Sequence, residues 1–239
     1  MEKETGVGVT EGLYLLCQPI MRITSLTQQT VKSYEVLLRS SSNNRFPQMA
    51  FSTFIQSDNN NAQLMLWYAE QLKDLCQRYP NTCFSVNIHP QQLLWQSTWD
   101  FLGQMIDQRA QLQIELTEHP PNLCACAHEG SFDLASALAK IKSYGYVLAI
   151  DDIGCGQNTL DLVFANLDQI DCLKFSMLPF VHLDEEIGWD FLRCWINLSD
   201  KYGLTLIAEG VEDKEKMAKL FAVGVTQQQG YLWSKGEKL

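Results

Sequence analysis

The sequence predicts a TIM-like (β/α)8 barrel, an α/β fold, in which one strand runs antiparallel to its neighbours. Three observations predict this fold. The chain has 239 residues, a length at which such barrels commonly form one domain. Eight short apolar runs alternate with longer amphipathic stretches, as parallel strands alternate with helices. The first two runs are separated by only a short polar turn, which favours an antiparallel hairpin.

The eight apolar runs are rich in Val, Ile, Leu and aromatic residues and have the length of strands. In chain order they occupy residues 13–20, 31–38, 83–88, 112–116, 147–150, 172–175, 205–208 and 225–229. Amphipathic patterns between them predict helices over residues 62–76, 132–144, 187–202 and 214–221. Gly145, Gly203 and Gly224 follow three of these patterns, where glycine commonly ends a helix. We therefore expect one domain over residues 13–239, preceded by a flexible segment at residues 1–12.

The composition excludes several classes of function. The formal net charge is -10, and no run of Lys and Arg is present. Because binding to nucleic-acid phosphates depends on basic residues, no DNA or RNA polymer is expected as a partner. No apolar run approaches the roughly 20 residues of a membrane span, and the polar N-terminus lacks the apolar segment of a signal peptide. The eight cysteines are scattered, which favours reduced thiols and a cytoplasmic location over disulfides.

Polar and charged residues end most of the predicted strands, or lie within them. Functional groups of a barrel gather where the strands end, so these side chains are expected to converge on one pocket. They are Glu35, Asn87, Glu115, Asp151, Asp152, Lys174, Glu209 and Gln229. Taken singly, each has an ordinary explanation: a strand-end carboxylate often caps a helix or forms an ion pair, and Lys174 could pair with any neighbouring acid. Five carboxylates in one ring, however, need cations to remain ionised.

An oxygen-rich acidic cluster of this kind predicts a site for divalent metal. Carboxylate and amide oxygens suit Mg²⁺, Mn²⁺ or Ca²⁺ rather than a soft metal. The adjacent Asp151 and Asp152 are suited to bridging two ions about 3.5–4 Å apart, an arrangement that supports phosphodiester hydrolysis.

The order of the motifs resembles that of the EAL-domain family, whose members are cyclic di-GMP phosphodiesterases. The motifs are Cys-Gln-Pro-Ile at 17–20, Glu-Val-Leu-Leu-Arg at 35–39, Val-Asn-Ile-His-Pro at 86–90, Ile-Glu-Leu-Thr-Glu at 114–118, Asp-Asp-Ile-Gly-Cys-Gly at 151–156, Leu-Lys at 173–174, Ala-Glu-Gly-Val-Glu at 208–212 and Gln-Gly-Tyr at 229–231. The resemblance implies a barrel with one antiparallel strand and hydrolysis of cyclic di-GMP to linear pGpG. It further implies a two-metal site for Mg²⁺ or Mn²⁺, inhibition by Ca²⁺, and a homodimer.

The resemblance also implies a role for each site residue. The metal ligands would be Glu35, Asn87, Glu115, Asp151 and Asp152. Lys174 would orient the attacking water or stabilise the phosphate, Glu209 would act as general base, and Gln229 would hold a metal-bound water. Substrate contacts would come from Gln18, Leu37 and Arg39. Glu118 would anchor the loop that follows the aspartate pair.

Several residues depart from the family pattern. The loop at residues 153–159 keeps two glycines but lacks the family's Thr and aromatic residue, and Ser176 stands where the family has Asp. Val36 replaces the Ala of the Glu-Ala-Leu tripeptide. Because no metal ligand is lost, an active enzyme is favoured. The alternative is a degenerate EAL domain that acts as a non-catalytic cyclic di-GMP receptor or as a protein-binding regulator.

A second group of possible metal ligands lies after Glu118. His119, Cys124, Cys126 and His128 fall within ten residues, and such residues can bind zinc. The Cys-x-Cys spacing is tighter than that of a usual zinc loop. We therefore expect a flexible loop here rather than a zinc site.

Overall fold

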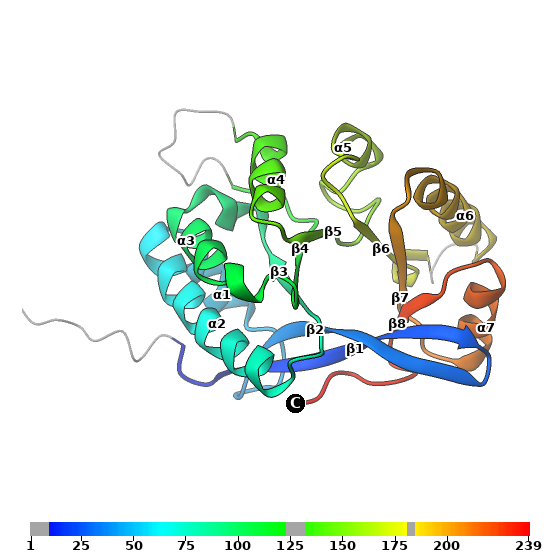
Figure 1. The fold of residues 1–239 in the computed structure, drawn as a ribbon, viewed down its shortest axis with the longest axis horizontal. Coiled ribbons are helices and arrows are strands. Elements are labelled where there is room, and N and C mark those ends of the chain that lie inside the picture. Colours follow the sequence, from blue (N-terminus) through cyan, green and yellow to red (C-terminus); the bar gives the residue numbers. More distant parts are fainter. Residues whose placement is uncertain (1–9, 123–131, 181–184) are drawn as a thin grey trace, which may run out of the picture.

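In a computed structural model, which describes residues 10–122, 132–180 and 185–239, eight strands form a closed barrel (Figure 1). The strands follow one another around the barrel in chain order. They are β1 Leu13–Ser25, β2 Gln28–Ser40, β3 Phe84–Ile88, β4 Leu112–Leu116, β5 Val147–Ile150, β6 Cys172–Ser176, β7 Thr205–Glu209 and β8 Gln227–Gln229. The predicted TIM-like barrel is therefore confirmed.

The antiparallel strand is β1, which pairs antiparallel with β2 on one side and with β8 on the other. All other neighbouring strands pair in parallel. The hairpin of β1 and β2 is longer than the apolar runs suggested, and Figure 1 shows it as a long ribbon on one side of the molecule. In the added part of β1, buried Met21 and Ile23 alternate with polar residues, so no continuous apolar run marks it.

The helices cover the outside of the barrel (Figure 1). They are α1 Gln48–Phe54, α2 Asp58–Arg78, α3 Gln96–Gln104, α4 Leu134–Ser143, α5 Leu160–Ala165, α6 Glu185–Tyr202 and α7 Lys214–Ala222. The four helices expected from amphipathic patterns are α2, α4, α6 and α7. Helices α1, α3 and α5, with seven, nine and six residues, were not predicted from amphipathic patterns.

Helix α2 begins four residues before the predicted start, within an Asn-rich segment that resembles a loop. The side chain of Ser57 caps the helix by accepting a hydrogen bond from the amide of Asn60. Asn61 is fully buried, and its amide donates to Ser97 Oγ and Thr98 Oγ1, both at 2.8 Å. These contacts attach the start of α2 to α3.

Two apolar clusters make up the core. The larger lies between the strands and the surrounding helices. The smaller consists of Ile20, Ala149, Cys172 and Ile207, which come from four different strands. Cys172 and Ile207 lie two residues before Lys174 and Glu209 on β6 and β7, so they share the face of the strand that carries these polar residues. The small apolar cluster therefore lies next to the polar residues of the candidate site.

The sequence predicts reduced cysteines and no membrane-spanning segment. Each cysteine within the described residues is free, as expected of reduced thiols. Cys124, Cys126 and His128 lie outside the described residues, as do residues 1–9. Across residues 10–122, 132–180 and 185–239, no helix combines the length and apolar character needed to cross a membrane.

Candidate metal and substrate site

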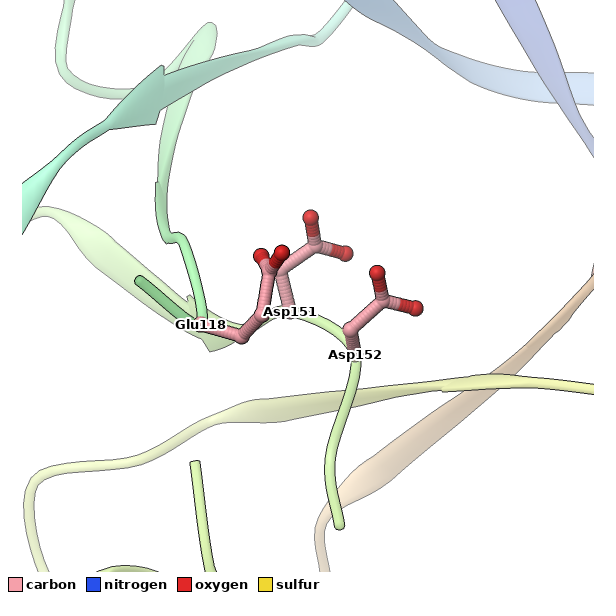
Figure 2. Close-up of side chains that lie close together, drawn as sticks. All are labelled: Glu118, Asp151 and Asp152. Atoms are coloured by element: carbon pink, nitrogen blue, oxygen red, sulfur yellow. The ribbon is translucent and has the colours of Figure 1, made fainter. Parts of the chain in front are cut away.

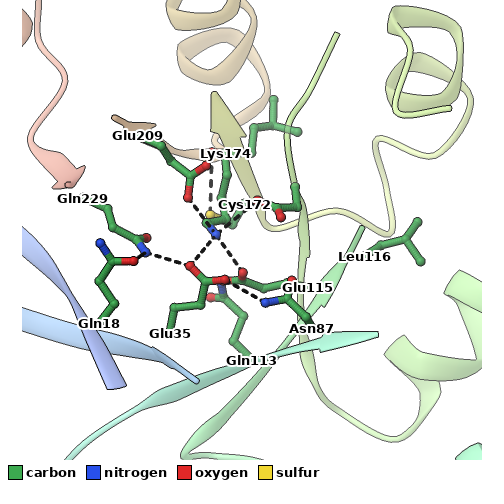
Figure 3. A network of polar contacts seen from close by, with 12 residues as sticks. Gln18, Glu35, Asn87, Gln113, Glu115, Leu116, Cys172, Lys174, Glu209 and Gln229 are labelled. Atoms are coloured by element: carbon green, nitrogen blue, oxygen red, sulfur yellow. Dashed lines mark hydrogen bonds and ion pairs between the residues drawn. The ribbon is translucent and has the colours of Figure 1, made fainter. Parts of the chain in front are cut away.

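The parallel register brings the polar strand-end residues to one end of the barrel. Asn87 on β3 lies opposite Glu115 on β4, and Ser176 on β6 lies opposite Glu209 on β7. Because β1 runs the other way, it contributes Gln18 from the middle of the strand, opposite Glu35 of β2. Figure 3 shows the side chains of Gln18, Glu35, Asn87, Glu115 and Glu209 pointing into a common space.

Lys174 lies at the centre of this group (Figure 3). Its side chain is fully buried, and its Nζ contacts four carboxylates: Glu35 within β2, and Glu115, Asp151 and Glu209 at the ends of β4, β5 and β7. The distances are 3.2 Å to Glu35 Oε2, 2.8 Å to Glu115 Oε2, 3.1 Å to Asp151 Oδ1 and 2.8 Å to Glu209 Oε1. Burial alone would lower the pKa of Lys174, but these carboxylates raise it well above its usual value. The four carboxylates therefore favour the charged form of Lys174.

Glu35 is held by more partners than the other carboxylates. It accepts hydrogen bonds from the amides of Asn87 and Gln229, each at 2.7 Å, as well as from Lys174. Burial would raise the pKa of Glu35, but Lys174 and the two amides lower it below its usual value. Gln229 in turn contacts Gln18 Oε1 at 3.2 Å. Glu35 is thus an ionised group in a fixed orientation.

The remaining carboxylates carry more negative charge than Lys174 can balance. Burial raises the pKa of Glu115 to about 7, although Lys174 opposes the shift. Burial, together with the charges of Asp151 and Glu118, raises the pKa of Asp152 to about 6. Burial also raises the pKa of Glu209 well above its usual value. An additional cation would stabilise the ionised form of each of these carboxylates.

Glu118, Asp151 and Asp152 can offer one ligand atom each within 4.8 Å of one another (Figure 2). In Figure 2 their carboxylates face a common space, Glu118 from the loop after β4 and the aspartates from the end of β5. Asn87 Oδ1 is buried and has no hydrogen-bond partner among the described residues, because the amide nitrogen is the atom that bonds Glu35. An all-oxygen donor set with an unpartnered buried oxygen fits a hard divalent cation.

A second cavity, of about 250 Å³, adjoins the acidic pocket. Arg39, Leu37 and Tyr68 contribute to its lining, as do four aromatic rings. The ring centroids are 5.1 Å apart for Phe46 and Phe51, 6.2 Å for Phe51 and His89, and 5.8 Å for His89 and His119. The sequence does not predict these rings as a group, because Phe46, His89 and His119 lie in loops, Phe51 lies in the short helix α1, and the four share no periodicity.

The structure distributes the predicted site residues over two neighbouring cavities. The acidic pocket, of about 260 Å³, is lined by Gln18, Glu35, Asp151, Asp152, Lys174, Glu209 and Gln229. The aromatic cavity is lined by Leu37, Arg39, Asn87 and Glu118. Asn87 and Glu118 join the two, since each also contacts or faces a carboxylate of the acidic pocket. Glu115 is fully buried beneath Lys174.

The loop after the aspartate pair is tied to Glu118 through the main chain. The amide of Gln157 donates to Glu118 O at 2.8 Å. Gly156 has a φ of +50°, and a Cβ at this position would lie 2.2 Å from the same carbonyl oxygen. The side chain of Glu118 instead faces the aspartates and contacts His119 Nδ1 at 3.0 Å. A place for Glu118 in the acidic cluster was not foreseen from the sequence.

The comparisons with known proteins agree with one another. In sequence, residues 9–236 match the family model of the EAL domain. Cyclic di-GMP phosphodiesterase PdeA of Borreliella burgdorferi is 29% identical over 65% of this chain, and PdeR of Escherichia coli, also named a cyclic di-GMP phosphodiesterase, is 24% identical over 86%. The chain spans only 23% and 32% of the lengths of these two relatives.

Solved structures extend the likeness to the whole fold. An EAL domain protein from Listeria monocytogenes superposes with a TM-score of 0.71 at 22% identity, covering 98% of this chain and 94% of its own. A Klebsiella pneumoniae protein in complex with calcium and cyclic di-GMP superposes with a TM-score of 0.70 at 23% identity, covering 94% of this chain and 55% of its own. By its sequence motifs, its barrel and the extent of the match, the chain belongs to the EAL domain family.

Proposed function

We propose that this protein is a phosphodiesterase that opens cyclic di-GMP to linear pGpG with Mg²⁺ or Mn²⁺, and so lowers the level of a second messenger in bacterial signalling. The observation that carries the proposal is the buried Lys174 in contact with four carboxylates, beside the Glu118, Asp151 and Asp152 cluster. The names of the related proteins support the substrate. The free cysteines among the described residues support a cytoplasmic setting.

The residues that would hold two metal ions are Glu35, Asn87, Glu115, Asp151 and Asp152. Bound ions would supply positive charge next to the phosphate and would lower the pKa of a water molecule. Oxygen donors do not exclude Ca²⁺, which prefers longer bonds and more ligands than Mg²⁺. We therefore expect Ca²⁺ to occupy the same oxygens and to inhibit turnover.

The chain's own residues would handle the protons of the reaction. Glu209 would accept a proton from the attacking water at its carboxylate, which is held by Lys174 at 2.8 Å. The water oxygen would bond to phosphorus and the P–O3′ bond would break. The O3′ would leave as a hydroxyl after taking up a proton from solvent, and Glu209 would return its proton to solvent before the next turnover. Lys174 would keep Glu209, Glu115 and Glu35 in place throughout, because its own proton is held tightly.

The aromatic cavity would take one guanine base of the substrate. Its rings can stack on the base, and stacking on aromatic side chains stabilises nucleic-acid bases by about 1–3 kcal/mol each. Arg39 lines this cavity and would bind a phosphate with its guanidinium. Leu37 would contact the base, and Gln18 would bind the substrate from the acidic side, where it already contacts Gln229.

A chromatographic assay with matched variants tests the proposed roles. We expect pGpG from the wild type in Mn²⁺, and a fall in kcat of about 10²–10⁴-fold for Glu209→Gln, as for the loss of a general base. Glu35→Ala should abolish turnover. Glu215→Gln removes a carboxylate of α7 that pairs with Lys219 on the surface, and it should leave turnover unchanged. Wild-type rates in Glu209→Gln would refute the role of this residue as proton acceptor.

The altered loop and Ser176 support a second candidate function, a non-catalytic receptor for cyclic di-GMP or a regulator that binds a protein. Ser176 faces Glu209 across the strand pair and provides no charge there. This alternative predicts binding of cyclic di-GMP without formation of pGpG, even in excess Mn²⁺. Binding that persists in a metal chelator, with no product, would favour it over the enzyme.

We further propose a homodimer formed through α5 and α6. Leu160 and Phe164 of α5 are about half exposed, as are Ile187 and Phe191 of α6. These helices follow β5 and β6, which pair with each other in the barrel. Exposed apolar groups on adjoining helices are typical of interaction surfaces. Light scattering should give a dimer for the wild type and a monomer for Phe164→Asp; dimers of both would exclude this surface.

A further inference from the structure

The loop after the aspartate pair closes on one buried side chain, Asn158. Asn158 is fully buried, and its Nδ2 donates to Leu116 O at 3.2 Å and to Asp151 O at 2.5 Å. Its main chain closes the loop as well: its carbonyl accepts from the amide of Gly154 at 2.7 Å, and its amide donates to Cys155 O at 2.9 Å. Asn158 therefore closes the loop through its main chain and bonds the ends of two strands through its side chain.

The two carbonyls bound by this amide belong to the strands that carry the acidic cluster. Leu116 is the last residue of β4 and follows Glu115, while Asp151 comes directly after β5. The amide of Asp151 also donates to Leu116 O at 3.0 Å, so the side chain of Asn158 reinforces an existing link between the two strands. The contacts fix where the main chain leaves the barrel.

The main chain immediately after this link is strained. Asp152 has a φ of +43°, in the left-handed region, which costs a non-glycine residue roughly 1–2 kcal/mol. This conformation directs the side chain of Asp152 toward those of Asp151 and Glu118 (Figure 2). A conformation of this kind persists only where neighbouring contacts determine it, and the Asn158 amide provides two of these contacts.

We infer that Asn158 is a positioning residue, whose amide holds the main chain of Asp151 and Asp152 so that their carboxylates are arranged for divalent metal before it binds. The inference rests on the proposed metal-dependent function. The chemistry of the side chain supports it: Asn Nδ2 carries two hydrogens, whereas a serine hydroxyl carries one and alanine none. Asn158 Oδ1 has no hydrogen-bond partner among the described residues, so its role lies in the amide donors.

Mn²⁺ binding to the full chain, measured by the electron paramagnetic resonance signal of free Mn²⁺, tests this inference without substrate. We expect the dissociation constant to rise about tenfold for Asn158→Ala and less for Asn158→Ser, which keeps one donor. A tenfold change corresponds to about 1.4 kcal/mol. Turnover should fall in the same order at limiting Mn²⁺ and recover in excess Mn²⁺, a recovery that a purely structural role would not produce.

Asn166 provides a matched control. It is also buried, and its Nδ2 donates to Leu162 O at 2.8 Å within the end of α5, away from the acidic cluster. Asn166→Ala should lower the melting temperature but leave the Mn²⁺ dissociation constant unchanged. Equal weakening of Mn²⁺ binding in Asn158→Ala and Asn166→Ala would overturn the inference, as would wild-type affinity in Asn158→Ala or a wild type that does not bind Mn²⁺.

The outcomes separate this inference from the proposed function. Graded losses of Mn²⁺ affinity in a protein that forms no pGpG would support the role of Asn158 and reject the enzyme. Formation of pGpG with unaltered Mn²⁺ dependence in the Asn158 variants would support the enzyme and reject the role. If Asn158→Ala does not fold, Asn158→Ser decides, because it retains one donor in a smaller side chain.

Discussion

Lys174 lies among more carboxylates than one ammonium can neutralise. Its contacts with Glu35, Glu115, Asp151 and Glu209 are all 3.2 Å or shorter. Removing one member of a buried ionic group leaves the others desolvated and unpaired, which is costly. The residue therefore stabilises the fold as well as the candidate site.

At the residue scale we predict that Lys174→Met lowers the free energy of unfolding in a metal chelator by about 3–5 kcal/mol, as expected for a broken buried ion pair. Mn²⁺ should then stabilise the variant more than the wild type, because the ion replaces a missing cation. Thermal denaturation with and without Mn²⁺ measures both effects. Lys142→Met, which removes a partly exposed pair with Asp171, should cost no more than about 1 kcal/mol. Equal losses in the two variants would contradict the account.

The strand ends of the site could be predicted from the sequence, but their contacts could not. A polar residue directly after an apolar run indicates a strand end, and this placed Glu115, Asp151, Lys174 and Glu209 correctly on the barrel. That Lys174 contacts four carboxylates at once depends on the closure and stagger of the strands. The aromatic rings of the second cavity could not be predicted either, because Phe46, His89 and His119 lie in loops and Phe51 lies in a helix of only seven residues.

At the scale of elements, the loop between β5 and α5 links Glu118 to the aspartate pair. Gly154 and Gly156 both have positive φ, but only Gly156 lies against another part of the chain. A Cβ at Gly156 would meet the main chain of Glu118, whereas one at Gly154 would meet nothing within 4 Å. Substitution of each glycine in turn therefore distinguishes the effect of backbone strain from the effect of displacing Glu118.

We predict that Gly154→Ala and Gly156→Ala each lose stability through their positive φ, by about 1–2 kcal/mol. Gly156→Ala alone should also weaken Mn²⁺ binding, because the methyl group displaces Glu118 from the aspartates. Calorimetric titration with Mn²⁺ distinguishes the two variants. Comparable Mn²⁺ affinity in both would show that the position of Glu118 does not matter to the metal.

A further prediction concerns the contacts between α2 and α3, which lie away from the candidate site. Asn61 donates to Ser97 and Thr98 and accepts from Gln92 Nε2 at 2.9 Å. Asn61→Ala leaves these buried groups unsatisfied and should cost about 1–3 kcal/mol in chemical denaturation. Asn59→Ala, at an exposed position of the same helix, should be within about 0.5 kcal/mol of the wild type. A near-neutral Asn61→Ala would contradict the proposed attachment.

The length of a helix limits whether its amphipathic pattern can be recognised in the sequence. Helices α2, α4, α6 and α7 have at least nine residues each, long enough for an amphipathic pattern. Helix α3 has nine residues, as many as α7, and its length does not explain why it was not predicted. Helices α1 and α5 have seven and six residues, about two turns, which is too short for periodicity to distinguish a helix from a loop. Their formation depends on packing against the barrel rather than on local pattern.

At the scale of the whole molecule, barrel closure turns residues from distant parts of the sequence into one site. Gln18 of β1 and Gln229 of β8 are in contact although 211 residues separate them. The fold class followed from the alternation of runs, and the single antiparallel strand from one short turn. Closure between β1 and β8 was implied only by the count of strands, because β8 has three residues.

We propose above all that the acidic mouth of this barrel hydrolyses cyclic di-GMP with divalent metal. The most direct measurement is chromatographic quantification of pGpG formed by the purified chain in Mn²⁺, in Mg²⁺ and in a metal chelator. We expect pGpG in stoichiometric excess over the protein with either metal, and none in the chelator. The absence of pGpG with both metals, in a folded protein that binds Mn²⁺, would contradict it.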